Sequence, residues 1–540
     1  MPVYPLTKGL SNKTIQKACV YALNHIDSLP DFLDEGKRKE LGLLSVNDAL
    51  MGIHCPHSDD EFRKSRKRIA FDEFFWFLYQ IRQNREEQSE FLIREPLLPV
   101  ADPERLIEML PYELTADQKK AWHEIETDME KKVPMNRLLQ GDVGSGKTVI
   151  AFLTLLKACA NGRQGCLMAP TEVLAEQHFR GLAELCRNYH LCIKPVLLLG
   201  SMGAKEKREA KQGIKDGSYN VIIGTHAVIQ KSVEYKNLAV VITDEQHRFG
   251  VNQREALRRK GDAVHVLVMS ATPIPRTLAL ILYGDLSIST IKELPSSRLP
   301  VKNCVIDESY RKKAMQFLKK EIRDGHQAYV ICPLVEMSET LDELENVIDY
   351  TEKLKNIFDS DIRIACLHGK MSFQEKEEIM NQFSLGNIDI LVATTVIEVG
   401  INVPNATVMM IENAERYGLA QLHQLRGRVG RGNNQSYCIF MSGSRSKKNE
   451  ERLDILNHSN DGFEIANRDL ELRGPGQLGG IQQSGDLGFS VADIYEDRDM
   501  LILANEYADT VLNSPEETSF LKNYSSLQVF GKFTDKIETL

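Results

Sequence analysis

The sequence lacks the features that mark membrane and secreted proteins. No apolar run approaches the ~20 residues that a bilayer-spanning helix needs. The first ten residues have no basic segment followed by an apolar stretch, which argues against a secretion signal. The ten cysteines are scattered from Cys19 to Cys438 without a CxxC pair. They are therefore predicted to be reduced core residues of a cytoplasmic protein that has no membrane partner.

Bias toward disorder, repetition or positive charge is also missing. With 26% charged and 42% hydrophobic residues and no internal repeat, the composition is that of a globular chain. Its 540 residues, at ~150 per domain, predict three or four domains. The net charge is −9, from 67 basic and 76 acidic residues. Any nucleic-acid partner must therefore be bound by a local positive groove, because the field of the whole molecule does not attract it.

Four segments differ in their sequence pattern. From Leu138 onward, short β-rich runs alternate with helical stretches, pause at a Pro-rich break at 294–300, and then resume. Such alternation predicts two tandem α/β domains, each with a parallel sheet covered by helices on both faces. The predicted boundaries are 1–110 for a helical segment, 111–297 and 298–455 for the two α/β domains, and 456–540 for a Gly-rich and then helical C-terminal segment. Strands are predicted at 137–140, 166–169, 196–199, 221–223, 239–243 and 265–269, and again at 301–306, 328–331, 364–366, 388–392, 407–411 and 437–441.

Three clusters in the helical segment each allow two interpretations. The aromatic run Phe74–Phe77 could stack on bases, but packing against a neighbouring element is the favoured prediction. The basic run Arg63–Arg68 is predicted to be a solvated helix turn rather than a binding patch. The cluster His54–His57 (HCPH) has no second pair at zinc spacing, so an ordinary loop is predicted there.

A glycine-rich loop comes after the first predicted strand. Residues 141–148 read GDVGSGKT, which fits G-x-x-x-x-G-K-[ST] between a strand and a helix. Glycines let backbone amides surround phosphate oxygens, and the helix N-terminus adds its positive dipole. Lys147 would neutralise the β- and γ-phosphates, and Thr148 would bind Mg²⁺. The candidate nucleotide-binding residues are Gly141, Asp142, Gly144, Ser145, Gly146, Lys147 and Thr148.

Two further positions complete a nucleotide site. Asp244 and Glu245 end an apolar strand, where Asp244 would hold Mg²⁺ and Glu245 would orient or deprotonate the attacking water. The alternative is a strand followed by an acidic loop. Upstream of the glycine-rich loop, a glutamine side chain at Gln118 could pair with the amino/N7 face of adenine, which would favour ATP over GTP.

An arginine block lies in the second α/β domain. Residues 421–432 read QLHQLRGRVGRG, with three arginines separated by glycines. Arg428 and Arg431 are predicted to reach the γ-phosphate across an interdomain cleft as arginine fingers. The alternative is a basic loop that contacts DNA phosphates. Because the glycine-rich loop and the arginines lie in different domains, hydrolysis would be coupled to closure of the cleft.

Taken together, these blocks resemble a superfamily 2 helicase motor, and more narrowly the RecG family of bacterial ATP-dependent DNA helicases. The blocks that resemble the first RecG lobe are 137–148, 169–177 (APTEVLAEQ), 224–227 (GTHA), 244–251 (DEQHRFGV) and 270–277 (SATPIPRT). Residues 394–400 (TTVIEVG) and the arginine block resemble the second lobe. Residues 461–476 and 483–485 resemble the TRG region that RecG shares with the transcription-repair coupling factor Mfd.

The resemblance implies two RecA-like domains and a motor that moves along double-stranded DNA and drives fork reversal or branch migration in recombination and repair. Thr171, Thr225 and Thr272 would then contact the DNA backbone or connect it to the ATP site. His247 would relay the nucleotide state between the lobes. Arg473 and Gln483 would convert lobe closure into DNA movement. ATP and Mg²⁺ are the expected cofactors, and the expected partners are branched and duplex DNA, with single-stranded DNA-binding protein as a further candidate for a monomeric enzyme.

Three departures from the family pattern modify this expectation. RecG proteins carry a wedge domain before their helical linker, whereas residues 2–10 already resemble that linker, so junction unwinding by this chain alone is expected to be impaired more than ATP hydrolysis. Asn402 stands where many helicases have an Asp that contacts the ribose. Asn467 and Gln477 stand where the TRG pattern usually has Glu, which would weaken the coupling of hydrolysis to movement.

Two other functions fit part of the pattern. An Mfd-like translocase that acts on stalled RNA polymerase would need a polymerase-binding module, and nothing in the first hundred residues suggests one. A non-hydrolysing, ATP-gated DNA-binding protein would lack Glu245 or the arginine fingers, and all of these residues are present.

Overall fold

A computed structural model describes most of the chain. The described residues are 4, 6–7, 9–26, 29–89, 96–244, 260–261, 263–270, 286–293, 299–333, 342–394, 403–432, 434–443, 446–473, 489–494, 496–512 and 514–525. They form two compact units, of which one combines residues from both ends of the chain and the other contains two parallel sheets.

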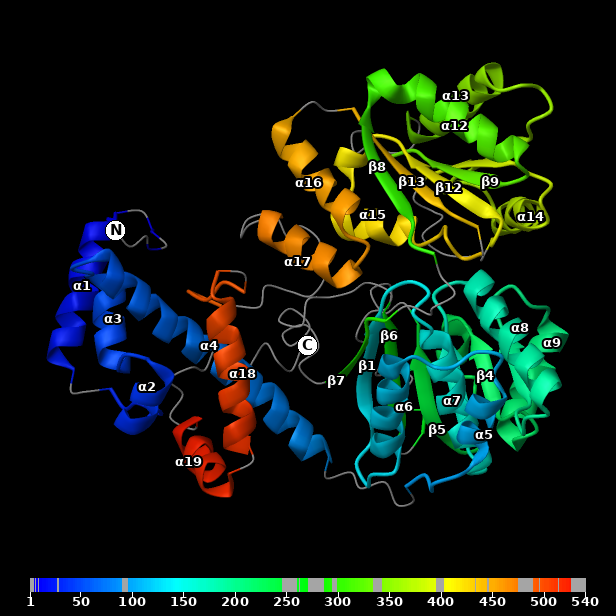
Figure 1. Cartoon of the computed structure of the whole chain (residues 1–540). Coiled ribbons are helices and arrows are strands. Elements are labelled where there is room, and N and C mark those ends of the chain that lie inside the picture. Colours follow the sequence, from blue (N-terminus) through cyan, green and yellow to red (C-terminus); the bar gives the residue numbers. More distant parts are fainter. Residues whose placement is uncertain are drawn as a thin grey trace. The chain divides into compact units, whose positions relative to one another are not determined.

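The first sheet has seven parallel strands in the order β3-β4-β2-β5-β6-β1-β7. The strands are β1 (Asn136–Gly141), β2 (Gln164–Met168), β3 (Pro195–Leu198), β4 (Val221–Gly224), β5 (Leu238–Thr243), β6 (His265–Ser270) and β7 (Ser287–Ile291). The helices of this lobe are α5 (Asp102–Met109), α6 (Ala116–Met129), α7 (Lys147–Ala160), α8 (Glu172–Tyr189), α9 (Ala204–Asp216) and the short 3₁₀ helix η1 (His226–Ile229). Helices α5 to α8 pack on one face of the sheet, and α9 and η1 pack on the other. Figure 1 shows α5 to α9 around this sheet.

The second sheet has six parallel strands in the order β10-β11-β9-β12-β13-β8. The strands are β8 (Lys302–Asp307), β9 (Gln327–Ile331), β10 (Ile364–Leu367), β11 (Ile390–Ala393), β12 (Ala406–Ile411) and β13 (Tyr437–Ser442). The helices are η3 (Glu308–Tyr310), α12 (Arg311–Arg323), α13 (Asp342–Ile357), α14 (Phe373–Ser384), η5 (Ala414–Arg416), α15 (Leu419–Arg426), α16 (Lys447–His458) and α17 (Gly462–Arg473). Side chains alternate along the strands, so α12 and α13 bury one face while α14, α15 and α16 bury the other.

The two tandem parallel α/β domains predicted from the sequence are confirmed. Each of the twelve predicted strands has an observed counterpart whose ends differ by no more than two residues. One strand was not predicted, β7, because only the two isoleucines of its sequence SISTI are strongly apolar, so the segment lacks the apolar run that marks the other strands. It pairs with β1 at the edge of the first sheet, which places β1 in the interior. The domain boundaries themselves stay predictions.

Helices from the two ends of the chain form the other unit. These are α1 (Asn12–His25), α2 (Glu35–Leu41), α3 (Val46–His54), α4 (Asp59–Ser89), α18 (Arg498–Leu512) and α19 (Pro515–Ser525). Phe74, Phe75, Trp76 and Phe77 of α4 are at most 2% exposed, and they share a core with residues of α18 such as Tyr507. The packing interpretation of this aromatic run is confirmed.

The prediction that the neighbouring basic run is a solvated helix turn is correct in part, because Arg63, Lys64 and Lys67 are exposed whereas Arg68 is not. Arg68 is completely buried, where its guanidinium bonds the carboxylates of Asp31 at 2.6 Å and Asp72 at 2.8 Å. Arg66 bonds Glu496 and Asp497, which precede α18. Asp72 is an i,i+4 partner of Arg68, but Asp31, Glu496 and Asp497 are far from these arginines in sequence, so local pattern could not show their pairing. Arg66 joins the two ends of the chain, whereas Arg68 is paired within the N-terminal helices, where a buried charge without its partner would be strongly destabilising.

The cysteine prediction is correct in part. All ten are free thiols, but Cys159, Cys166, Cys332 and Cys438 alone are buried, while Cys192 and Cys304 are exposed. In the turn between α3 and α4, His54 bonds the Tyr4 hydroxyl at 2.7 Å and His57 bonds Glu61 at 3.1 Å. Among the helices that the structure describes, none has the length and apolar character required to cross a bilayer.

Candidate functional site

The loop between β1 and α7 has the conformation of a phosphate cradle. Gly144 and Gly146 adopt positive φ angles of 82° and 85°, which L-residues with a Cβ rarely adopt. A Cβ on Gly146 would lie 2.2 Å from Nε2 of Gln118, so this position also lacks space for a side chain. The loop ends at the N-terminus of α7, and the backbone N–H groups and dipole of a helix N-terminus favour an anion.

Lys147 is folded back onto the loop that precedes it. Its Nζ donates to the backbone oxygens of Gly141 at 2.8 Å and Asp142 at 2.9 Å. The side chain is 9% exposed, so the ammonium is held at the centre of the cradle rather than in solvent. Thr148, the next residue, is exposed. The two residues therefore lie where a phosphate and its metal ion would be bound at the start of α7.

Gln118 supports the loop from the start of α6. Thr115 and Gln118 form a capping box, in which Gln118 Oε1 accepts the N–H of Thr115 at 2.9 Å. Its Nε2 donates to the backbone oxygen of Ser145 at 2.8 Å. Each end of the amide thus makes one bond within the protein, and each retains one further hydrogen-bonding position with which adenine could pair.

Asp142 connects the loop to the second lobe. Its Oδ1 lies 2.6 Å from Nε2 of His423, in the last turn of α15. Burial alone would raise the pKa of the Asp142 carboxyl, but the bond to His423, the N–H of Val143 and the charge of Lys147 together lower it. Next to this bond, a Cβ on Gly427 would lie 2.9 Å from Cβ of Val143. The end of α15 therefore rests directly on the phosphate loop.

Asp244 lies at the carboxyl end of β5, two strands from β1 in the same sheet. Its Oδ2 is 2.8 Å from Nε2 of His178 on α8, and its N–H bonds the backbone oxygen of Met168. His178 is 6% exposed and orients the carboxylate from the side. Glu245 and His247, predicted to act with Asp244, lie outside the described residues.

The donor atoms near the loop suit a hard cation. Within the described residues no cluster of three or more His, Cys, Asp or Glu could hold a metal ion by itself. The Thr148 hydroxyl and the Asp244 carboxylate are oxygen donors, and Mg²⁺ is usually held by one or two such groups together with substrate phosphates and water. The residues present therefore fit a magnesium ion that arrives with a nucleotide.

The arginine loop starts where α15 touches the first lobe. Arg428 and Arg431 are both partly exposed, and Arg431 Nε donates to the backbone oxygen of Gly427 at 3.1 Å. Burial raises the pKa of Tyr329 to about 12, and the positive charges of Arg428 and Arg431 oppose that shift. Gly427 places the start of their loop beside Val143 of the phosphate loop.

The structure describes only some of the other residues that were predicted to couple ATP hydrolysis to DNA movement. Thr171 is the N-cap of α8, and its hydroxyl accepts the N–H of Leu174. Thr225 is 2% exposed at the end of β4, and its hydroxyl has no hydrogen-bond partner among the described residues. Arg473 ends α17, but its side chain is not described. Thr272 and Gln483 lie outside the described residues, as do Asn402 and Gln477 of the expected departures.

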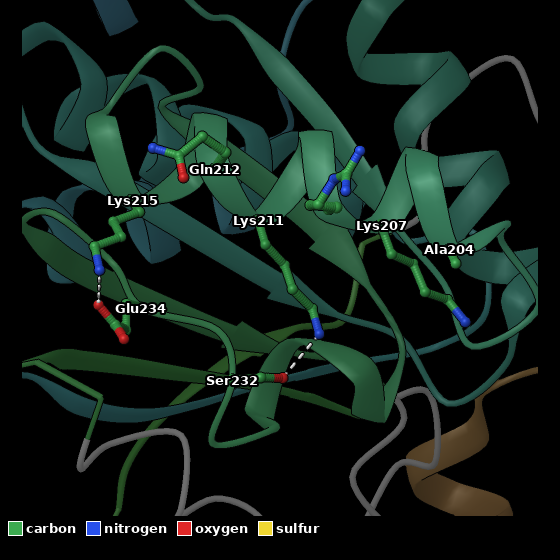
Figure 2. Close-up of a pocket in the computed structure, with 8 residues that line it drawn as sticks. Ala204, Lys207, Lys211, Gln212, Lys215, Ser232 and Glu234 are labelled. Atoms are coloured by element: carbon green, nitrogen blue, oxygen red, sulfur yellow. Dashed lines mark hydrogen bonds and ion pairs between the residues drawn. The ribbon is translucent and has the colours of Figure 1, made fainter.

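A basic depression lies on the first lobe, along α9. It has a volume of about 460 Å³ and is lined by Ala204, Lys207, Arg208, Lys211, Gln212, Lys215, Ser232 and Glu234. Figure 2 shows the lysines projecting from one side of the helix, with Lys211 bonded to Ser232 and Lys215 to Glu234. Four cations and one carboxylate line it, in a chain whose net charge is −9. This is a local positive surface of the kind that the overall charge requires for a nucleic-acid partner.

Two residues of the site were not singled out from the sequence. His423 lies inside the arginine block, but the predicted roles in that block were assigned to Arg428 and Arg431. His178 comes directly after the block 169–177, but a single histidine on an amphipathic helix carries no signal of its own. Only the structure shows that both histidines bond carboxylates of the nucleotide site.

Comparison with known proteins agrees with this geometry. Residues 115–281 match the DEAD/DEAH box helicase family, and residues 311–433 match the helicase conserved C-terminal domain. Residues 459–528 match domain 3, C-terminal, of ATP-dependent DNA helicase RecG. The ATP-dependent DNA helicase RecG of Bacillus subtilis is 43% identical over 521 residues, which cover 95% of this chain and 75% of that protein. The chain belongs to the RecG family.

Two further relatives define the extent of the similarity. RecG of Synechocystis is 44% identical over 514 residues, or 95% of this chain and 61% of that protein. A solved structure of RecG bound to a three-way DNA junction has a TM-score of 0.71 and 41% identity, and it covers 93% of this chain and 66% of that chain. The chain thus spans between about three fifths and three quarters of the length of these RecG proteins.

Proposed function

We propose that the chain hydrolyses ATP to move along duplex DNA, and that it acts on branched DNA in recombination and repair. The observation that carries this proposal is the phosphate loop of the first lobe in direct contact with the start of the arginine loop of the second. A nucleotide bound at α7 would therefore be reached from both lobes. Membership of the RecG family supports DNA as the track, and the relative solved on a three-way junction supports a branched substrate.

Each residue of the site has a proposed role. Lys147 neutralises the β- and γ-phosphates, and Glu245 orients the attacking water. Thr148 and Asp244 hold Mg²⁺, which when bound would offset phosphate charge and align the terminal phosphoryl group. Arg428 and Arg431 stabilise the charge that develops on the γ-phosphoryl group during transfer.

The test is ATP hydrolysis by wild type and Lys147→Ala, measured without DNA, with linear duplex and with a three-way junction. We expect DNA to stimulate the wild type, with the junction the stronger stimulus, and the alanine variant to lose at least ~10²-fold in kcat because the lysine charge acts on the transferred phosphoryl group. Lys205→Ala, an exposed lysine of α9 that does not line the depression, is the matched control. Equal wild-type rates with and without DNA would contradict the proposal.

Movement and strand separation are tested separately. Displacement of a third strand from a triplex reports movement along duplex DNA, whereas release of a labelled strand from a junction reports unwinding. We expect the wild type to displace the third strand, because the proposed function requires movement along duplex DNA. Equal activity in both assays would show that this chain separates strands by itself.

We further propose that the basic depression on α9 contacts the phosphate backbone of the DNA. Lys207, Lys211 and Lys215 recur every fourth residue and so form one stripe on the helix. Their ammonium groups are held by the backbone oxygen of Gly200 at 2.5 Å, by Ser232 at 2.8 Å and by Glu234 at 2.7 Å. Oxygen acceptors that already orient these lysines leave each with further N–H donors for a phosphate.

Charge reversal on this stripe tests the contact. Lys207→Glu/Lys211→Glu should lower duplex affinity about tenfold or more and reduce the slope of log affinity against log salt by about 2, because each phosphate contact contributes roughly 0.9 to that slope. Lys205→Glu makes the same kind of charge reversal at a single position on a different face of α9, and it should leave the slope nearly unchanged. An identical slope in both variants would place the DNA elsewhere.

A further inference from the structure

The contact between the phosphate loop and α15 contains a histidine whose protonation pattern the structure defines. Arg426 Nη2 lies 2.6 Å from His423 Nδ1, and His423 Nε2 lies 2.6 Å from Asp142 Oδ1. A guanidinium can only donate hydrogen bonds, so Nδ1 must be the acceptor and carries no proton. The proton therefore lies on Nε2 and points at the carboxylate. Arg426 selects the one neutral tautomer that can donate to Asp142.

His423 and Arg426 are both held in place by buried contacts within the second lobe. His423 and Arg426 are each 3% exposed, in the last turn of the helix. Arg426 Nη1 also donates to the backbone oxygen of Ser459 at 2.9 Å, in the segment between α16 and α17. The imidazole therefore cannot turn away from Asp142 without breaking a buried bond of a charged group, which is costly.

The same turn ends in a glycine that the contact requires. A Cβ on Gly427 would lie 2.9 Å from Cβ of Val143, closer than two such atoms approach. Arg428 is the next residue, and Arg431 Nε holds the backbone oxygen of Gly427. Two independent features, a tautomer-specific hydrogen bond and a close backbone approach, thus fix the origin of the arginine loop on the phosphate loop.

We propose that His423 is a positioning residue, which through Asp142 sets the register of the Arg428/Arg431 loop against bound nucleotide. The inference rests on the proposed hydrolysis of ATP and on the proposed role of these arginines. Its consequence is a defect in the chemical step with little loss of nucleotide binding. Arginines that act on the transition state raise kcat without strengthening ground-state binding, so their displacement lowers kcat and leaves KM nearly unchanged.

Two substitutions of His423 distinguish a role of its hydrogen bonds in positioning from a role in filling space in the fold. Glutamine can accept from Arg426 with Oε1 and donate to Asp142 with Nε2, so His423→Gln keeps both bonds. Leucine fills a similar volume and keeps neither. With a saturating three-way junction, we expect His423→Leu to lower kcat about tenfold or more with KM for ATP and ADP affinity changed less than about twofold, and His423→Gln to stay within about threefold of wild type.

A double-mutant cycle tests the partner. If His423 acts through Asp142, then His423→Leu/Asp142→Ala should be no slower than the slower of the two single variants, because residues that act as one unit are not additive. Gly427→Ala should lower kcat as well, and Val143→Gly in the same chain should restore part of it by removing the opposing Cβ.

The outcomes distinguish this inference from the function on which it rests. A wild-type kcat in His423→Leu, an equal defect in the glutamine and leucine variants, or fully multiplicative effects in the cycle would each overturn the positioning role. Arg428→Ala is measured in parallel. If Arg428→Ala keeps wild-type hydrolysis, the proposed arginine role fails. If Arg428→Ala is inactive while His423→Leu is not impaired, only the inference about His423 fails.

Discussion

The two lobes have the same topology and differ in the loop that comes after their first strand. Replacing β1 to β6 by β8 to β13 converts the order β3-β4-β2-β5-β6-β1 into β10-β11-β9-β12-β13-β8, which is the order of the second sheet. After β1 the chain forms a glycine loop with two positive φ angles and starts α7. After β8, Asp307 caps the short helix η3 by accepting the N–H of Ser309 at 2.8 Å. The first lobe leaves a helix N-terminus for a phosphate, whereas the second caps the equivalent end with its own carboxylate.

The strand that precedes each loop also differs between the lobes, in its burial and in its place in the sheet. β1 lies between β6 and β7 and is buried from Arg137 onward, whereas β8 is an edge strand with exposed positions. The additional strand β7 accounts for the difference. The backbone oxygen of Ile291 at its end would lie 2.8 Å from a Cβ on Gly141, so β7 also closes one side of the phosphate loop. Shared topology thus supplies two candidate sites, and local packing turns one of them into a nucleotide site.

The largest effect on the difference between the two lobes is expected from Gly146→Ala, which places a side chain in the phosphate loop. Its Cβ would meet the Gln118 amide at 2.2 Å in a left-handed conformation, so we expect loss of the bond to Ser145 and a fall in ATP affinity of about 100-fold, or roughly 3 kcal/mol. Binding of a fluorescent ATP analogue measures it. Gly386→Ala in the second lobe, at φ 77° with nothing within 4 Å, is the control for strain alone and should leave affinity unchanged. Unaltered binding in Gly146→Ala would show that the cradle tolerates a side chain.

A second difference concerns acid stability. His265 begins β6 and accepts the N–H of Met135 at 3.0 Å, whereas Tyr437 begins the equivalent strand β13. Burial lowers the pKa of His265 to about 4, against an opposing effect of the Asp128 charge. Below about pH 6.5 the His265 imidazole therefore binds a proton in the unfolded chain, whereas in the folded lobe it stays neutral down to about pH 4. Because the unfolded state binds more protons, the free energy of unfolding falls as the pH drops from about 6.5 to 4. The full effect is about 3 kcal/mol.

Tryptophan fluorescence can measure this in the first lobe alone. The chain has two tryptophans, so Trp76→Phe leaves Trp122 of α6 as the reporter. Urea unfolding of this protein at pH 7 and pH 5 should show the loss, and His265→Gln should reduce it while still accepting the N–H of Met135. An equal pH dependence in both proteins would assign the acid sensitivity to other groups.

The smallest expected effect is at the capped end of the second lobe. Asp307→Ala should cost about 1 kcal/mol in the stability of that lobe, the usual contribution of an N-cap, and should leave ATP hydrolysis within about twofold of wild type. Asp307→Asn keeps an acceptor and should retain most of the stability. Thermal unfolding and steady-state hydrolysis measure the two quantities. A large loss of hydrolysis in Asp307→Ala would mean that the second lobe contributes more than its arginines.

Sequence patterns predicted the two α/β lobes better than the helical ends. The β-rich runs sit at regular intervals between helices, so local periodicity alone placed twelve strands. β7 was not predicted because serine and threonine separate its two isoleucines and leave no apolar run. Its pairing with β1 identifies it as a strand. In the helical ends, Arg66 and Arg68 resembled solvated charges because Asp497 and Asp31, which pair with them, are not neighbours in sequence.

The same division applies to the site. The glycine-rich loop, Asp244 and the arginine block are recognisable from residue types at fixed spacing, because each motif lies within one strand–loop–helix element. Their family resemblance, confirmed by comparison with RecG proteins, adds the DNA substrate as an expectation. The bond between Asp142 and His423 could not be predicted, since the two residues are 281 positions apart and the motif around each does not show which residue of the other lobe it contacts.

The residues alone determined the chemistry available to the protein: where the backbone curls around phosphate, where oxygen donors end a strand, and where guanidinium groups are concentrated. Only the tertiary structure decided which of these groups meet. It paired Arg68 with Asp31, placed β7 against Gly141, and turned the proton of His423 toward Asp142. Such contacts depend on the packing of elements distant in the chain, and no local sequence signal encodes that packing.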